Sequence, residues 1–147
     1  MPILNYTTKI DYFKTIGEIQ QVLTKSGCKK IVVDFQDSKP IGMTFTLQYQ
    51  EREIAFAMPC RFDGVLRTLK KNKKVPKSLC TEEQAIRVGW RIILNWIESQ
   101  MAMVEAETAS MAEIFPTWAV TSNGETISER VLNNSEGRGV FLLQEKG

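Results

Sequence analysis

The sequence predicts a single α+β domain, in which a three- to four-stranded antiparallel sheet is packed by a short helix and one long C-terminal helix. Three consecutive runs alternate apolar and polar residues, and capped amphipathic segments precede and follow them. Apolar residues make up 43% and charged residues 24% of the 147 residues, as in soluble globular proteins. We expect this domain to span residues 1–116 and residues 117–147 to form a polar, partly ordered tail.

The segment before the alternating runs is expected to hold one edge strand and one helix. Ile3 to Thr8 has strand-like residues and would pair at a sheet edge. Thr15 and Glu18 have capping-box spacing, and Gly27 stands where a left-handed C-cap residue is favoured. The first helix is therefore predicted at about 16–26.

The three alternating runs are predicted strands of an antiparallel sheet with one solvated face. They read KKIVVDF, IGMTFTLQYQ and REIAFAM, with polar turns between them, and Pro59 ends the sheet. The residues expected to face the core are Ile31, Val33, Phe35, Met43, Phe45, Leu47, Tyr49, Ile54, Phe56 and Met58.

Two further helices are predicted after the sheet. A short one covers about 61–71, and a long one starts after the capping residue Thr81 and runs to a stop at Pro116. From Glu82 to Phe115 it would be about 50 Å long, more than the 35–40 Å or so of a compact domain of this size. It is therefore expected to bend near Ala109–Ser110 or to project.

The long helix is apolar on more than one side, which favours burial on more than one side. One stripe of the helix can cover the sheet. The remaining apolar surface must be covered either by other parts of the same chain, including the late apolar stretch GVFLL, or by a second subunit. We predict a homodimer whose contact lies off the inner stripe or beyond the sheet, at Trp96, Met103, Met111 and Ile114.

The composition argues against an enzyme. The chain has no histidine, which excludes Ser-His and Cys-His nucleophilic pairs, and its three cysteines, Cys28, Cys60 and Cys80, are too few and too scattered for a structural zinc site. Phosphate-loop glycine motifs are missing. We expect no catalytic residue, no metal and no cofactor. The N-terminus lacks the features of a signal peptide and no apolar run is long enough to span a membrane, so a cytoplasmic protein is expected.

One basic run stands out in the charge pattern. RTLKKNKKVPK, residues 67–77, holds six positive charges and no negative one. Cations at a helix C-terminus complement the helix dipole, so the run can be interpreted as a solvated helix end. The two other interpretations are a surface that contacts nucleic acid and a surface that contacts an acidic protein partner. Two arginines four residues apart on the long helix could add to a phosphate site. The predicted nucleic-acid-binding residues are Arg67, Lys70, Lys71, Lys73, Lys74, Lys77, Arg87 and Arg91.

Several segments resemble an uncharacterised family of small proteins from bacteriophages and integrated mobile elements. They are the start MPILNYTT, EIQQVL, MPC, and the long-helix sequence QAIRVGWR within EEQAIRVGWRIILNWIESQMAMVEA. The likeness covers about residues 1–115 and implies a genetic setting but no catalytic residue.

The leading functional hypothesis is therefore a non-catalytic accessory protein of a virus or mobile element that contacts nucleic acid through Arg67–Lys77. The alternative is an inhibitor of a host defence system that binds a host protein or a signalling nucleotide.

Overall fold

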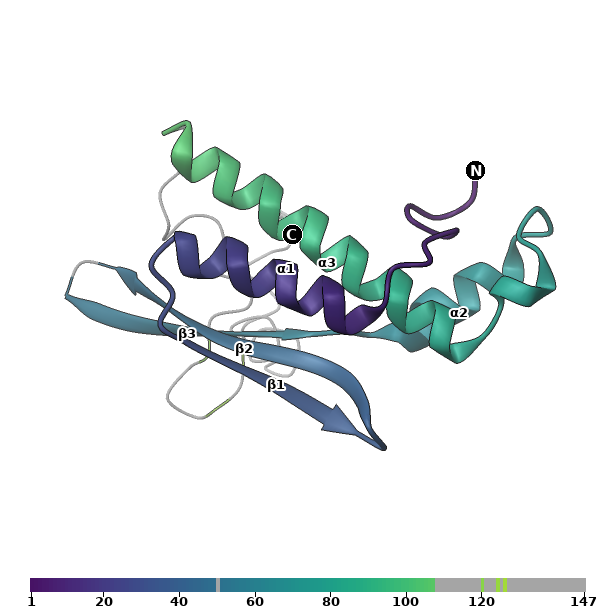
Figure 1. Cartoon of the computed structure of the whole chain (residues 1–147), viewed down its shortest axis with the longest axis horizontal. Helices are drawn as coiled ribbons and strands as arrows, with labels where there is room; N and C mark the ends of the chain where they lie inside the picture. The colour runs from purple at the N-terminus through teal and green to yellow at the C-terminus, as the bar shows by residue number, and fades with distance from the viewer. Residues whose placement is uncertain (50, 108–119, 121–123, 125, 127–147) are drawn as a thin grey trace, which may run out of the picture.

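The chain folds in the order helix, three strands, two short helices and a long helix. The computed structural model describes residues 1–49, 51–107, 120, 124 and 126 (Figure 1). The elements are α1 (Tyr12–Lys25), β1 (Lys30–Gln36), β2 (Lys39–Tyr49), β3 (Arg52–Pro59), α2 (Phe62–Lys71), the 3-10 helix η1 (Lys77–Leu79) and α3 (Glu82–Glu105). The predicted α+β class and the antiparallel sheet are confirmed.

The sheet is a meander of order β1-β2-β3, in which neighbouring strands are antiparallel. Phe45 pairs with Phe56 across β2 and β3, and their rings stack with centroids 5.6 Å apart. As the alternation predicts, both rings are buried, as are Met43, Leu47 and Met58. These side chains form the floor of the main core.

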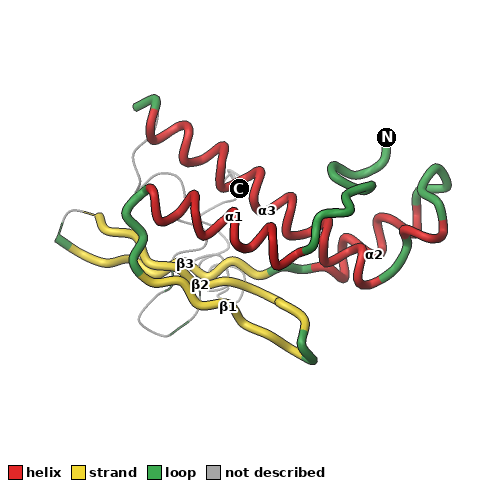
Figure 2. The backbone as a smooth tube through the Cα atoms, viewed as in Figure 1, coloured by secondary structure: helices red, strands yellow, loops and turns green. Residues whose placement is uncertain are grey.

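Helices α1 and α3 lie side by side over one face of this sheet, and α2 lies beyond its end (Figures 1 and 2). The main core lies between the sheet and these two helices, with Ile19 and Leu23 from α1 and Trp90 and Ile97 from α3 fully buried. Trp90 also donates its indole Nε1–H to the carbonyl oxygen of Pro40 at 3.1 Å. Its one polar group is thus satisfied inside the core.

The predicted inward position of Phe35 is wrong, since its side chain is 52% exposed. β1 is an edge strand, and its register against β2 shifts between Asp34 and Phe35. The bulge and the edge position leave the ring at the margin of the helix layer, where it meets only the exposed ring of Phe13 in α1 among the aromatic contacts of the described residues. Ile31 and Val33 earlier in β1 pack half-buried against the core, and the side chain of Tyr49 lies outside the described residues.

The N-terminal segment does not form the predicted edge strand. Ile3 to Thr8 instead makes two turns, in which Tyr6 N–H donates to the Ile3 carbonyl and Thr8 N–H to the Asn5 carbonyl. Asn5 takes a left-handed conformation, with φ of 66°, which Asn tolerates better than most residues.

Helix α1 starts four residues earlier than predicted. Asp11 caps it by accepting from Phe13 N–H, and Thr15 lies fully buried inside the helix. At its other end Gly27 has φ of 94°, the predicted left-handed C-cap glycine.

Helix α3 starts where predicted but ends ten residues earlier. Thr81 caps it by accepting from Gln84 N–H at 3.1 Å, and it stops at Glu105, with Glu107 in a left-handed conformation (φ 61°). Its 24 residues span about 36 Å, which matches the width of the domain. The length argument for a projecting helix is therefore wrong.

The predicted dimer through α3 therefore loses one of its two arguments, the length of the helix. Trp96 packs half-buried against the main core, whereas Met103 is 42% exposed near the end of α3. Met111 and Ile114 lie outside the described residues, as do the Ala109–Ser110 bend, the Pro116 stop and the GVFLL stretch. None of the helices in the described part of the chain is long and apolar enough to cross a membrane.

Candidate nucleic-acid interface

A second, smaller core fixes α2 and the chain after it against α3. Its buried members are Leu69 of α2, Val75 of the following loop and Ala85 of α3, and half-buried apolar side chains surround them. Leu69 and Ala85 are fully buried and Val75 is 5% exposed. The loop between α2 and α3 is thus attached to the domain by its own apolar contacts.

The loop has a defined backbone geometry at its centre. The side-chain Oδ1 of Asn72 accepts from Lys74 N–H at 2.9 Å, and the Asn72 carbonyl accepts from Val75 N–H at 3.1 Å. This is an Asx turn closed by a backbone turn. Because Val75 points into the small core, the neighbouring lysines are directed toward solvent.

The six cations of the basic run are all exposed. Lys70 and Lys71 end α2, Lys73 and Lys74 sit on the Asx turn, Lys77 starts η1, and Arg67 lies one turn back in α2. We call these six residues the basic turn. Within the described part of the chain, no ion pair involves any of them. Their charge is therefore available to an outside anion.

The basic turn borders an open hollow of about 510 Å³. Its lining residues are Lys70, Asn72, Lys73, Val75, Lys77 and Cys80. Ammonium groups around an apolar base provide charge and hydrogen-bond donors, and the half-buried thiol of Cys80 lies in the same lining. Such an arrangement of cations is suited to holding a phosphate-bearing ligand.

The two arginines of α3 that were predicted to bind nucleic acid have ion-pair partners within the described part of the chain, unlike the residues of the basic turn. Arg91 pairs with Glu18 of α1, and Arg87 contacts Glu83 at 3.8 Å and the Gln84 side-chain oxygen at 2.9 Å. The Arg91 guanidinium thus joins α3 to α1, whereas the Arg87 guanidinium contacts two residues of α3 itself. The structure groups six of the eight predicted residues and gives the other two intramolecular partners.

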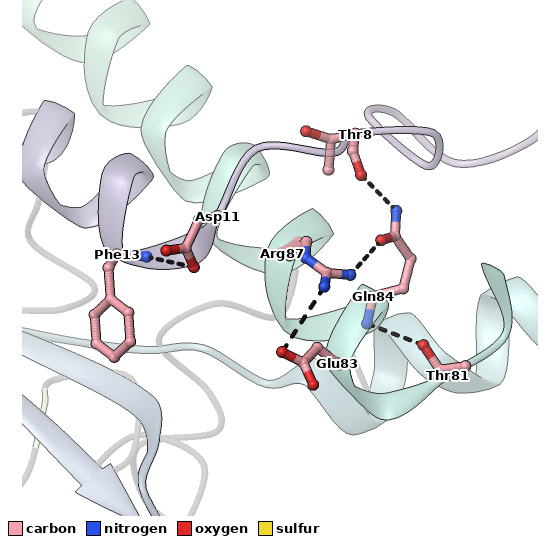
Figure 3. A network of polar contacts seen from close by, with 7 residues as sticks. All are labelled: Thr8, Asp11, Phe13, Thr81, Glu83, Gln84 and Arg87. Atoms are coloured by element: carbon pink, nitrogen blue, oxygen red, sulfur yellow. Dashed lines mark hydrogen bonds and ion pairs between the residues drawn. The ribbon is translucent and has the colours of Figure 1, made fainter.

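Gln84 has a structural role that the sequence does not predict, because its helix-capping position gives no sign of its contacts with the N-terminal segment. Its side chain is 3% exposed and its Nε2 donates to the carbonyl oxygens of Tyr6 and Thr8, both at 2.9 Å. Figure 3 shows this residue between the N-terminal segment and Arg87. Gln84 therefore holds the two N-terminal turns on α3, beside the small core that supports the basic turn.

The cysteines and carboxylates of the described residues do not gather into a metal-binding group. Cys28 and Cys60 are buried free thiols and Cys80 is half-buried, and burial raises the pKa of the Cys60 thiol to about 12. In the part of the chain that the structure describes, no group of three or more cysteines and carboxylates is placed to hold a metal ion. A hydrogen bond from Lys39 to Glu82, at the start of α3, raises the pKa of the lysine.

No protein-family model, no curated protein and no solved structure matches the chain.

Proposed function

We propose that this protein is a non-catalytic accessory protein that contacts nucleic acid through the basic turn. The observation that carries the proposal is the exposure of six cations on a short, anchored segment, with no acidic partner among the described residues. The setting in a bacterial virus or mobile element follows from the sequence resemblance and is part of the same proposal.

The anchoring of the turn supports a binding role. A freely moving loop would lose conformational entropy of its backbone as well as of its lysine side chains on binding. Here the Asx turn at Asn72 and the buried Val75 already fix the backbone, so only the side chains remain to be ordered. The helix dipole of α2 stabilises cations at its end, but this explains Lys70 and Lys71 better than it explains Lys73, Lys74 and Lys77.

The chemistry of the turn favours backbone contact over base recognition. Lysine acts as a point charge toward phosphate, whereas base edges are usually read by planar, bidentate groups such as Arg, Asn and Gln. No aromatic residue lies between the lysines in the sequence, although aromatic side chains are what single-strand binders stack against bases. We therefore expect weak sequence preference and binding that depends on phosphate charge.

A matched pair of variants tests the proposal. One replaces Lys70, Lys71, Lys73 and Lys74 with Ser, and the control replaces four exposed lysines outside the turn, Lys9, Lys14, Lys25 and Lys29. Both variants lose the same charge, so a general electrostatic effect would weaken both equally. Binding of a fluorescent oligonucleotide, followed by anisotropy at low salt, should fall at least about tenfold more in the first variant. Equal affinities of the two variants would contradict the proposal.

A further inference from the structure

Strand β1 forms one long edge of the sheet. Among the described residues it pairs with β2 alone, whereas the opposite edge strand, β3, receives a hydrogen bond from Val120 N–H at the Ala55 carbonyl, at 2.8 Å. An edge strand presents backbone N–H and C=O groups that can pair with another strand. Within the described part of the chain, the edge of β1 therefore presents backbone groups by which the sheet can be extended.

Exposed apolar side chains lie on both sides of this edge. Val32 is 57% exposed on the face away from the helices, and Phe35 on the helix side is 52% exposed. Phe13 of α1 is also 52% exposed and lies beside Phe35, with ring centroids 6.3 Å apart. Apolar groups gathered along an open edge are typical of an interaction surface.

The charges of β1 are arranged symmetrically around Val32. Ile31 and Val33 pack toward the core, so Lys30, Val32 and Asp34 share the opposite face of the strand. The register of β1 against β2 is regular from Lys30 to Asp34, and the bulge follows it. The regular part of the edge is therefore the sequence Lys-Ile-Val-Val-Asp, with a cation at one end and an anion at the other.

We propose that β1 pairs antiparallel with β1 of a second copy of this chain, about a two-fold axis at Val32. In this register Lys30 faces Asp34 of the second copy, twice, and Val32 faces Val32. Opposite charges directly across an antiparallel pair are favourable and like charges are unfavourable. Charged edge residues normally discourage pairing, but this spacing makes them complementary to a second copy.

Neighbouring registers fit less well. A two-fold axis at Val33 sets Val32 opposite Asp34 and Lys30 opposite Gln36, and an axis at Ile31 sets Lys30 opposite Val32. Only the axis at Val32 pairs both charges. The resulting dimer has a continuous six-stranded sheet and a two-fold, isologous interface. This interface differs in place from the predicted contact on α3, and it does not depend on the nucleic-acid proposal.

The ion pair between Lys30 and Glu53 of the same chain competes only weakly with the proposed pairing. Lys30 Nζ lies 4.0 Å from Glu53 Oε2, and both side chains are largely exposed, at 71% and 49%. An exposed pair at that distance contributes little. The lysine can therefore turn toward a second copy at small cost.

Charge reversal with mixing tests the proposal. Lys30→Asp makes the edge all acidic and Asp34→Lys makes it all basic, so neither variant can pair with itself, but each is complementary to the other. Sedimentation velocity from about 1 μM to about 100 μM covers the affinities expected of a small interface. The wild type should reach about 33 kDa, twice the 16.7 kDa of the chain. Each variant alone should stay near 17 kDa, and an equimolar mixture should return to about 33 kDa.

Two controls keep the outcome interpretable. Circular dichroism melting checks that both variants fold, and Val32→Lys, which places like charges at the axis on an exposed position, should also be monomeric. Lys9→Asp, the same charge reversal away from the sheet, should remain dimeric. A wild type that stays monomeric at about 100 μM, variants that dimerise alone, or a mixture that stays monomeric would each overturn the proposal.

Discussion

Replacement of Gln84 by Glu isolates one of the contacts that hold the N-terminal segment on α3, beside the hydrogen bond from Asn5 to Asn95. The two side chains have nearly the same shape, so the substitution changes chemistry and leaves packing intact. The Nε2 group that donates to the Tyr6 and Thr8 carbonyls becomes an oxygen, which faces both acceptors without a proton. The substitution therefore removes two hydrogen bonds at a residue that is 3% exposed.

The magnitude follows from these contacts. A hydrogen bond contributes about 1 kcal/mol net, and an acceptor left buried without a donor costs about 1–3 kcal/mol. Arg87, which already donates to the Gln84 oxygen, offsets part of this loss by facing a carboxylate. We expect the free energy of unfolding to fall by about 2–4 kcal/mol. If the N-terminal segment detaches by itself, the fall will be smaller and the chain will become more open to trypsin at Lys9.

Urea unfolding followed by tryptophan fluorescence measures the global loss, and limited trypsin digestion measures local detachment. Gln20→Glu, on the exposed surface of α1, adds the same charge without breaking a buried contact and should change stability by less than about 0.5 kcal/mol. Gln84→Glu would refute the reasoning if it matched this control in both assays.

Two other predictions concern the buried thiol of Cys60 and the neighbouring α3. A Cβ at Gly89 would lie 2.9 Å from Cys60 Sγ, so Gly89→Ala should lower the free energy of unfolding by about 1–2 kcal/mol despite its gain in helix propensity. In a Cys60→Ala background the same substitution should not be destabilising. Urea unfolding of the wild type, the two single variants and the double variant decides whether the loss comes from this contact or from the backbone. Because burial raises the pKa of Cys60 from 9.0 to about 12, the native state keeps a proton that the unfolded state loses above pH 9. The wild type should therefore lose up to about 1.4 kcal/mol of stability per pH unit between pH 9 and pH 12 beyond any loss in Cys60→Ala; parallel pH profiles of the two proteins would contradict this pKa.

Local patterns were sufficient to predict most of the fold. Alternation in residues 41–50 and 52–58 places Phe45 and Phe56 correctly, because a strand with one buried face leaves a period of two in the sequence. The cap at Thr81 is likewise a local signal and is observed. What failed depends on partners that are distant in the sequence.

The N-terminal turns illustrate this limit. The strand-like composition of Ile3 to Thr8 is overridden by the left-handed Asn5 and by Gln84, which bonds to carbonyls 76 and 78 positions away in the sequence. The sequence predicts a stop at Pro116, but α3 ends at Glu105, because a proline prevents a helix from continuing and does not require the helix to reach it.

The candidate site shows the same division. The six residues of the basic turn are contiguous, so the sequence alone groups them. The pairing of Arg91 with Glu18 joins positions 73 apart, and no local pattern reports it. The Asx turn was readable in principle, since Asn followed by polar residues favours a side-chain bond to the backbone two positions on.

The salt dependence of oligonucleotide affinity tests the central proposal most directly. If four to six cations of the basic turn each neutralise one phosphate of a duplex, log K plotted against log salt should have a slope of about −3.5 to −5.5. The variant that lacks Lys70, Lys71, Lys73 and Lys74 should lose about 3.5 of this slope, whereas the four-lysine control should keep it. An affinity that does not change with salt, or an unchanged slope in the first variant, would contradict binding through the basic turn.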